Sequence, residues 1–414
     1  MTLPDPAQLD AADPLREFRS RFFIDDPDLI YLDGNSLGRM PLAACEILHR
    51  QAEDGWGSRL VRGWNEGWFD LPARLGAKIA SLIGAEPDEV VVADSTSVNL
   101  FKLAAAALEF QSGRSQIVSD DLNFPSDLYV LQGLAQTAGR KVVMARSPDG
   151  IEPGDVEPLI GGETALLTLS HTAFKSGAIR DMAAISAAAR SVGALTLWDL
   201  SHSVGAVPVD LSGSGIDLAI GCTYKYLSGG PGAPAFLYVR RDLQERLRNP
   251  IAGWFGQARP FAFELKYEPA SSLRRFQTGT PPILSLAAIE PGVDLVIEGG
   301  MDRIREKSML LTGFLADLWE RDLRPLGVAL NSPLDAARRG SHISFGHPDG
   351  WRVDRALIED ARVIPDFREP DNIRFGLSPL YTTFTEVDEA VRRFRELLEQ
   401  RTYEKYPPAR AEVT

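Results

Sequence analysis

The chain has 414 residues but only two cysteines, Cys45 and Cys222, and neither belongs to a CxxC pair. Two isolated cysteines exclude a disulfide framework and are typical of a reducing compartment, so we expect a cytoplasmic location. No stretch of about 18 consecutive apolar residues occurs, which argues against a membrane-spanning helix. The beginning, MTLPDPAQLDAADP, is acidic and proline-rich, unlike a signal peptide.

Histidines and positive charge are also scarce. None of the five histidines lies three or four residues from another, so we expect no histidine-rich metal site. The formal net charge is −13, which argues against a broad surface for nucleic acid or anionic membranes but permits a small positive pocket. Hydrophobic residues make up 44% of the chain, as in globular proteins, and the length predicts two or three domains with a large core.

Short aliphatic runs alternate with helical patterns from about residue 73 to about residue 240. The alternation predicts an α/β fold, with a mostly parallel sheet whose two faces are covered by helices. Ligands of such sheets bind beyond the carboxyl ends of the strands. Strands are expected at 89–94, 115–120, 141–145, 164–170, 194–199, 217–221 and 235–240, and helices at 72–84, 98–110, 126–136 and 180–193.

The pattern changes after Pro281-Pro282, where it becomes helical to about Leu323. Strand candidates follow in GSHISFGHP and NIRFGLSPLY, and an amphipathic helix is expected after Thr385. We therefore expect a smaller C-terminal α+β domain. The predicted division is an N-terminal segment, 1–30, that packs with the small domain, a large domain, 31–290, and a small domain, 291–414.

Polar residues follow two of the predicted strands in positions that suit ligand binding. Asp94-Ser95-Thr96-Ser97 stands between a strand and a helix, where amides and hydroxyls form an anion cup; a plain helix N-cap is the alternative. Asp199 ends the strand ALTLWD and is followed by His202. Its carboxylate faces the expected ligand crevice, or else caps the next helix.

A lysine and an arginine are further candidates for ligand binding. Lys225 follows a buried strand, lies between Tyr224 and Tyr226 and precedes a glycine-rich stretch. Partial desolvation lowers the pKa of such an amine and makes it a Schiff-base nucleophile; a surface loop lysine is the alternative. Arg374 offers a planar fork for a substrate carboxylate, although a structural ion pair is the commoner fate of an arginine.

These four features together suit pyridoxal phosphate. That cofactor needs a lysine, an acid beside the pyridine nitrogen, an anion cup for its phosphate and an arginine for the amino-acid substrate. The chain also resembles the kynureninase family of fold type I pyridoxal-phosphate enzymes. The resemblance runs from YLDGNSLG at Tyr31 to the segment around Arg374 and is carried by NFPSD, WDLSHSVG, TYKYLSGGPG, GWFG and TPPIL.

The resemblance implies a role for each matching residue. Lys225 is expected to bind the cofactor and act as the base at Cα, Asp199 to pair with the pyridine nitrogen, and Tyr224 to relay a proton. Cofactor contacts are also expected from Thr96, Ser97, Phe124, Asp127, Ser170, His202, Tyr224, Trp254 and Thr280, of which Trp254 and Thr280 come from the neighbouring subunit of a homodimer. Substrate contacts are expected from Arg374, which holds the carboxylate, and from Ser36, Trp64, Gly279 and Thr280.

Several of these residues also have a structural interpretation. Phe124 and Trp254 could be core aromatics, Trp64 could pair with Trp68 at the surface, and His202 could satisfy a loop carbonyl. Tyr226 and Cys222 are expected to serve packing alone.

The reaction implied by the resemblance is hydrolysis of L-kynurenine, or of its 3-hydroxy derivative, to anthranilate (or 3-hydroxyanthranilate) and L-alanine. The implied setting is tryptophan catabolism or nicotinamide-cofactor synthesis. An aminotransferase would use the same lysine, aspartate and arginine. A cysteine desulfurase would need a nucleophilic cysteine after the lysine, and none follows Cys222. A catalytically silent regulator with the same fold is a third alternative, which the intact Lys225, Asp199 and Arg374 disfavour.

Overall fold

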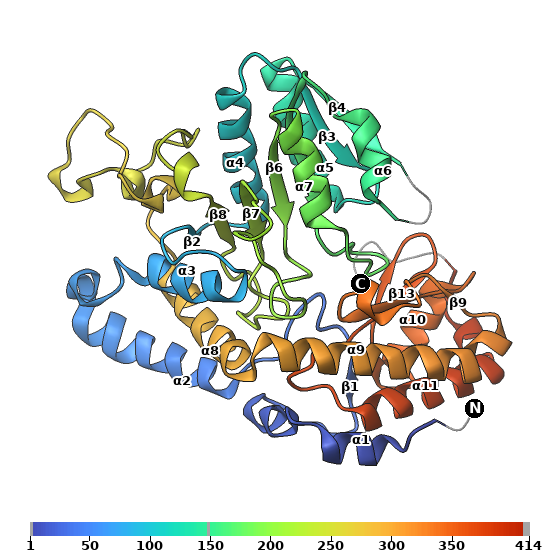
Figure 1. Cartoon of the computed structure of the whole chain (residues 1–414). Coiled ribbons are helices and arrows are strands. Elements are labelled where there is room, and N and C mark those ends of the chain that lie inside the picture. The colour runs from blue at the N-terminus through green and yellow to red at the C-terminus, as the bar shows by residue number, and fades with distance from the viewer. Residues whose placement is uncertain (1–2, 147–149, 409–414) are drawn as a thin grey trace.

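A seven-stranded sheet forms the centre of the computed structural model, which describes residues 3–146 and 150–408. The strand order is β2-β8-β7-β6-β5-β3-β4 (Figure 1). Only β8 runs against its neighbours, so the other six strands end at the same edge. The strands are β2 (Val90–Val92), β3 (Gln116–Asp120), β4 (Lys141–Ala145), β5 (Thr164–Ser170), β6 (Leu195–Asp199), β7 (Leu218–Gly221) and β8 (Phe236–Val239).

Helices cover both faces of this sheet, because its strands are apolar on both sides. On one face Leu197 and Ile220 pack with α4 and α5, and on the other Trp198 and Ala219 pack with α3, α7 and α8. The mostly parallel α/β sheet and all seven of its strands agree with the prediction. The covering helices are α3 (Leu71–Leu82), α4 (Thr96–Phe110), α5 (Pro125–Ala138), α7 (Met182–Ser191) and α8 (Ile283–Gly299).

The helical region after Pro282 is divided into two helices, whereas the sequence predicted one helical stretch to about Leu323. Gly300 adopts φ +77°, a left-handed conformation that ends α8 and lets α9 (Met301–Leu318) begin in a new direction. A π-helical turn, Trp319–Leu323, completes the region. Helix α9 runs from the large sheet along the C-terminal part of the chain (Figure 1).

A second, four-stranded antiparallel sheet lies in the C-terminal part, in the order β12-β13-β10-β9. Its residues alternate: Ile343, Phe345, Ile373 and Phe375 are buried in an apolar core with α11, and the residues between them are polar. The elements are β9 (Ala329–Leu330), β10 (His342–Gly346), β12 (Asp366–Arg368), β13 (Asn372–Gly376), α10 (Gly350–Glu359) and α11 (Phe384–Glu399).

The N-terminal residues contact both parts of the molecule. Phe18 and Phe22 are buried in the core of the large sheet, whereas Leu9 packs against the C-terminal core. β1 (Ile30–Tyr31) pairs with β11 (Val363–Ile364) in parallel. The domain boundaries at residues 30 and 290 stay a prediction, and the predicted N-terminal and small domains include residues 1–2 and 409–414, which lie outside the described residues. The remaining helices are α1 (Pro6–Ala12), α2 (Leu42–Arg50) and α6 (Pro153–Val156).

Within the described residues, no helix combines the length and apolar character needed to cross a membrane.

Candidate active site

A cavity lies at the edge where β2, β5, β6 and β7 end, between the large sheet and the C-terminal sheet. Its walls bring together residues from segments more than 300 positions apart in the chain. Most of the predicted site residues line it: Ser36, Thr96, Ser97, Phe124, Asp127, Ser170, Asp199, His202, Tyr224, Lys225 and Arg374. Asn35, Ser126, Phe174, Ser201 and Arg368 also line it and were not predicted.

Lys225 lies in the turn four residues after the end of β7, and its Nζ lies 2.8 Å from Nε2 of His202. Burial lowers the pKa of His202 well below its usual value, and the charge of Lys225 lowers it further. The imidazole is therefore neutral at physiological pH, and its Nδ1 has no hydrogen-bond partner in the protein. The rings of Phe124 and Tyr224 flank the ammonium group, each with its centroid 6.0 Å away. His202 thus contacts the lysine rather than a loop carbonyl.

Two buried carboxyl groups lie in the same cavity. Asp199 ends β6 and accepts a hydrogen bond of 2.8 Å from the backbone N–H of Ser201; turns, not a helix, follow it. Burial raises the pKa of Asp199, while the charge of Lys225 opposes the rise. Burial and the charge of Asp199 raise the pKa of Asp127 well above its usual value, and Oδ2 of Asp127 has no partner. These shifts favour the protonated form of Asp127 more than is usual for a carboxyl group.

The first turns of α4 and α5 meet at the cavity wall. Ser95 is the N-cap of α4, with its side chain 3.4 Å from the amide of Val98. Oγ of Ser97 lies 2.8 Å from Oγ of Ser126 in α5. Amides at a helix N-terminus attract anions, so the N-cap interpretation and the anion-cup interpretation describe the same turn.

Asn123 fixes the loop before α5, a role that was not predicted. Its Oδ1 accepts hydrogen bonds from Oγ of Ser170 at 2.5 Å and from the amide of Phe124 at 2.9 Å. Phe124 meets Phe174 edge to face, with ring centroids 5.2 Å apart. Asn123 belongs to the NFPSD string, which could have drawn attention to it.

Arg374 forms the buried ion pair that was the structural alternative for this residue. It lies on β13 opposite Asp366 of β12, and its Nε donates to Oδ1 of Asp366 at 2.7 Å. Its Nη2 pairs with Oδ2 of the same carboxylate, and its Nη1 donates to the carbonyl of Phe174 at 2.5 Å. The guanidinium still lines the cavity. No sequence pattern pointed to Asp366, because its strand is only three residues long and too short for alternation to be recognised.

Four predicted site residues lie outside the cavity of their own chain. Trp64 and Trp254 both pack against Phe255, with ring centroids 5.4 Å and 5.1 Å away. Trp64 also meets Trp68 edge to face. Gly279 and Thr280 line a separate small cavity beside Asp94.

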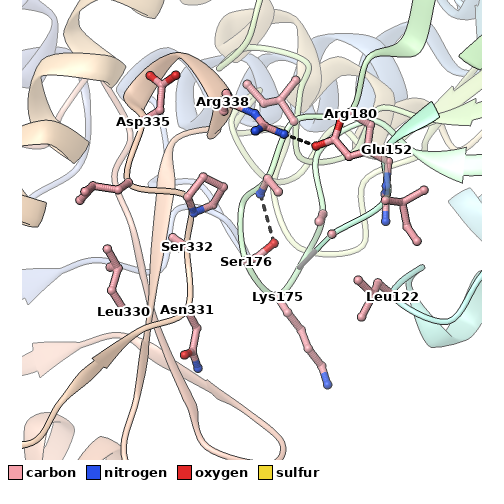
Figure 2. A pocket seen from close by; sticks show the side chains of 17 residues that line it. Leu122, Glu152, Lys175, Ser176, Arg180, Leu330, Asn331, Ser332, Asp335 and Arg338 are labelled. Atoms are coloured by element: carbon pink, nitrogen blue, oxygen red, sulfur yellow. Dashed lines mark hydrogen bonds and ion pairs between the residues drawn. The ribbon is translucent and has the colours of Figure 1, made fainter. Parts of the chain in front are cut away.

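A larger cavity of about 630 Å³, against about 190 Å³ for the candidate site, opens elsewhere between the two sheets (Figure 2). It lies between 173–180 and 330–338, and the ion pair of Glu152 and Arg338 spans it. None of the predicted site residues lines it. In the described part of the chain, no group of three or more His, Cys, Asp or Glu residues is placed to hold a metal ion.

Comparison with solved structures places the fold. The cysteine desulfurase CsdA of Escherichia coli has a TM-score of 0.79 at 19% identity and covers 96% of this chain and 100% of its own. C-DES, in a structure with glycine covalently linked to its PLP cofactor, has a TM-score of 0.76 at 19% identity and covers 95% of this chain and 100% of its own. The chain therefore has the fold type I architecture of pyridoxal-phosphate enzymes, as predicted.

Comparison of sequences identifies the family within this fold. A kynureninase of Pseudomonas fluorescens is 46% identical over 409 residues, 97% of each chain. A kynureninase of Burkholderia mallei strain SAVP1 is 43% identical over 403 residues, 96% of each chain. The family model described as the kynureninase C-terminal domain matches residues 304–394. The chain belongs to the kynureninase family.

Proposed function

We propose that this protein is a pyridoxal-phosphate-dependent hydrolase that converts L-kynurenine and water to anthranilate and L-alanine. The observation that carries the proposal is the convergence of Lys225, Asp199 and Arg374 on one cavity, in a chain of the kynureninase family. The reaction breaks the Cβ–Cγ bond, and the oxygen of water ends in the carboxylate of anthranilate. The 3-hydroxylated substrate is an alternative of the same chemistry.

The residues of the cavity fit pyridoxal phosphate. Asp127 Oδ2 and His202 Nδ1 are buried polar atoms without protein partners, as expected where a polar ring is to bind. Asp199 would hold a proton on the pyridine nitrogen, and Thr96 and Ser97 at the start of α4 would bind the phosphate. When bound, the cofactor supplies an electron-accepting ring that stabilises negative charge at Cα of the substrate.

Lys225 and Arg374 have complementary tasks in this scheme. Arg374 would hold the substrate carboxylate, and Lys225 would take the proton from Cα as general base. Phe124, which is 39% exposed, would present the face of its ring to the cofactor. The neutral His202 beside Lys225 keeps the amine directed into the cavity through the 2.8 Å contact.

Tyr224 would return a proton to the alanine fragment. The charge of Cys222 and burial both raise the pKa of Tyr224 above its usual value, so its hydroxyl keeps its proton at working pH. A phenol that stays protonated is a donor rather than a base. We propose Tyr224 as the relay because it lines the cavity next to Lys225.

We also propose a homodimer in which Trp254 and Thr280 reach the partner's cavity. Both lie outside the cavity of their own chain. Figure 1 shows the yellow segment after β8 extending away from the sheet. Large apolar side chains are exposed in this segment, which is typical of an interaction surface: Phe261, Phe263 and Leu265. Trp56, Leu60 and Val61 are exposed as well. A cytoplasmic location is proposed from the two free cysteines.

The test is incubation of the purified, cofactor-loaded protein with L-kynurenine while anthranilate fluorescence is recorded. We expect fluorescence to rise without any keto acid present. A protein that requires a keto acid would be an aminotransferase instead. A protein that binds the cofactor but leaves L-kynurenine unchanged would share the fold of these enzymes without the proposed activity.

A further inference from the structure

Arg374 has little left to offer a substrate carboxylate. A guanidinium carries five N–H donors, and two of those of Arg374 are held by Asp366, one by the carbonyl of Phe174 and one by Oγ of Ser36 at 3.3 Å. One N–H remains. Because a bidentate grip on a carboxylate needs two, Arg374 in this arrangement cannot make it alone. Its charge is also balanced by the carboxylate of Asp366.

A second arginine lies beside this pair. Arg368 stands two residues after Asp366 on β12, so both side chains point to the same face of the sheet as Arg374. Nη2 of Arg368 lies 2.6 Å from Oδ2 of Asp366, and it also approaches Oγ of Ser36 at 3.5 Å. The Arg374 side chain is 2% exposed, but that of Arg368 is 34% exposed and lines the same cavity. Asp366 is thus placed between two guanidinium groups.

Below pH 7 the charges of the cluster formed by Asp33, Asp354, Asp366, Arg368 and Arg374 do not cancel. Burial would raise the pKa of Asp366, but the hydrogen bond and charge of Arg374 and the charge of Arg368 bring it below its usual value, so Asp366 is an anion. Burial and the charge of Asp366 raise the pKa of both Asp33 and Asp354 to about 7.

The imidazoles that face the cluster add no positive charge. Burial lowers the pKa of His202 well below its usual value and that of His342 to about 3. Two guanidinium groups therefore face one permanent carboxylate and two carboxyl groups that are largely neutral below pH 7. Below pH 7 the cluster therefore carries a net positive charge at the cavity wall, in addition to the ammonium group of Lys225.

We infer that Arg368 is a second carboxylate-binding arginine, which contacts the α-carboxylate of the amino-acid substrate together with Arg374. Asp366 is the positioning residue that holds the two guanidinium groups side by side, and Ser36 links it to the opposite wall through a 2.8 Å hydrogen bond. Nη1 of Arg368 also donates to the carbonyl of Phe367 at 2.8 Å. The substrate carboxylate thus meets one N–H of the buried Arg374 and the more exposed guanidinium group of Arg368. This inference rests on the proposed hydrolysis of L-kynurenine.

The test compares Arg368→Gln, Arg368→Lys and the surface control Arg392→Gln with the unchanged holoenzyme. Arg392 pairs with Glu389 and Glu396 on α11, away from the cavity. We expect Arg368→Gln to raise KM for L-kynurenine about tenfold or more while kcat changes less than about threefold. Arg368→Lys should recover part of the loss, because it keeps the charge without the fork. The control should behave like the unchanged enzyme.

A substrate without the carboxylate makes the test specific. With the carboxamide of L-kynurenine, the KM ratio between Arg368→Gln and the unchanged enzyme should fall to near one. Binding of the product L-alanine, measured by calorimetry, should weaken in Arg368→Gln and partly return in Arg368→Lys.

Two results would overturn the inference: an unchanged KM for L-kynurenine in Arg368→Gln, or an equal penalty on acid and carboxamide. If Arg368→Gln does not fold, Arg368→Lys alone decides, because an unchanged KM there, together with unchanged L-alanine binding, would also contradict the inference. Failure of the unchanged holoenzyme to release anthranilate would instead reject the proposed function.

Discussion

Nζ of Lys225 and Nε2 of His202 lie 2.8 Å apart, which joins the turn after β7 to the turn after β6 at the cavity wall. The imidazole is neutral, so it accepts a hydrogen bond from the ammonium group without repelling it. The contact holds the amine in place, as suits the proposed attachment of the cofactor to Lys225.

Replacement of this amine gives the first prediction. Lys225→Ala should remove the visible absorption band of the lysine-bound cofactor and reduce kcat by at least about a thousandfold, because both the covalent link and the base at Cα are lost. Absorption spectroscopy and turnover of L-kynurenine measure the two effects. The exposed Lys141 on β4 provides the control variant Lys141→Ala, which should keep both. A surviving band in Lys225→Ala would assign cofactor attachment to another residue.

The two carboxyl groups should respond differently to amide substitution. Burial and the charge of Asp199 raise the pKa of Asp127 and favour its neutral form, so Asp127→Asn should change kcat by less than about tenfold. Asp199→Asn removes the anion proposed to keep the pyridine nitrogen protonated, and should lower kcat by about a hundredfold or more. Steady-state kinetics of both variants tests the assignment. If Asp127→Asn instead lowered kcat more than Asp199→Asn, Asp127 rather than Asp199 would be the partner of the pyridine nitrogen.

Substrate affinity should depend on pH through Asp33 and Asp354. Both carboxyl groups have their pKa raised to about 7, so they are mostly neutral below that pH and become negative above it. The added negative charge opposes the substrate carboxylate at Arg368 and Arg374. We therefore expect KM for L-kynurenine to rise between about pH 6 and about pH 8, and the rise to be smaller in Asp33→Asn. The same KM–pH curve in the variant and the unchanged enzyme would contradict this.

A buried ion pair outside the cavity should matter for stability. Lys102 is fully buried, and its Nζ donates at 2.7 Å both to Oδ2 of Asp94 and to the carbonyl of Phe276. Lys102→Met leaves Asp94 without its cation and should lower the free energy of unfolding by about 3 kcal/mol. Urea denaturation measures the loss. In the double variant with Asp94→Asn the loss should be smaller than the sum of the two single losses; strict additivity would mean that the pair does not interact.

The large sheet could be predicted from the sequence, and so could the cavity residues at the ends of its strands, because both depend on local patterns. A buried run such as TALLTLS defines a strand, and residues at its carboxyl end or in the turn that follows lie at the ligand edge. Ser170 and Asp199 end their strands, and Lys225 lies in the turn after β7. The break at Gly300 could not be predicted, because a glycine within a helical pattern costs only about 1 kcal/mol and marks no end by itself.

The C-terminal wall of the cavity depends on long-range pairing instead. Asp366 and Arg368 lie on a three-residue strand, too short for alternation to be recognised, and their significance arises only when β12 pairs with β13. Asn123 was overlooked for a similar reason, since its partner Ser170 lies 47 residues further along the chain. The proposed contacts of Trp254 and Thr280 with the cofactor require a second subunit and stay a prediction.

The most direct test of the proposed reaction is the product ratio from L-kynurenine with purified, cofactor-loaded protein and no keto acid. Hydrolysis of the Cβ–Cγ bond predicts anthranilate and L-alanine in equal amounts, with both absent in Lys225→Ala. Consumption of L-kynurenine without L-alanine, or only after a keto acid is added, would contradict the proposed function.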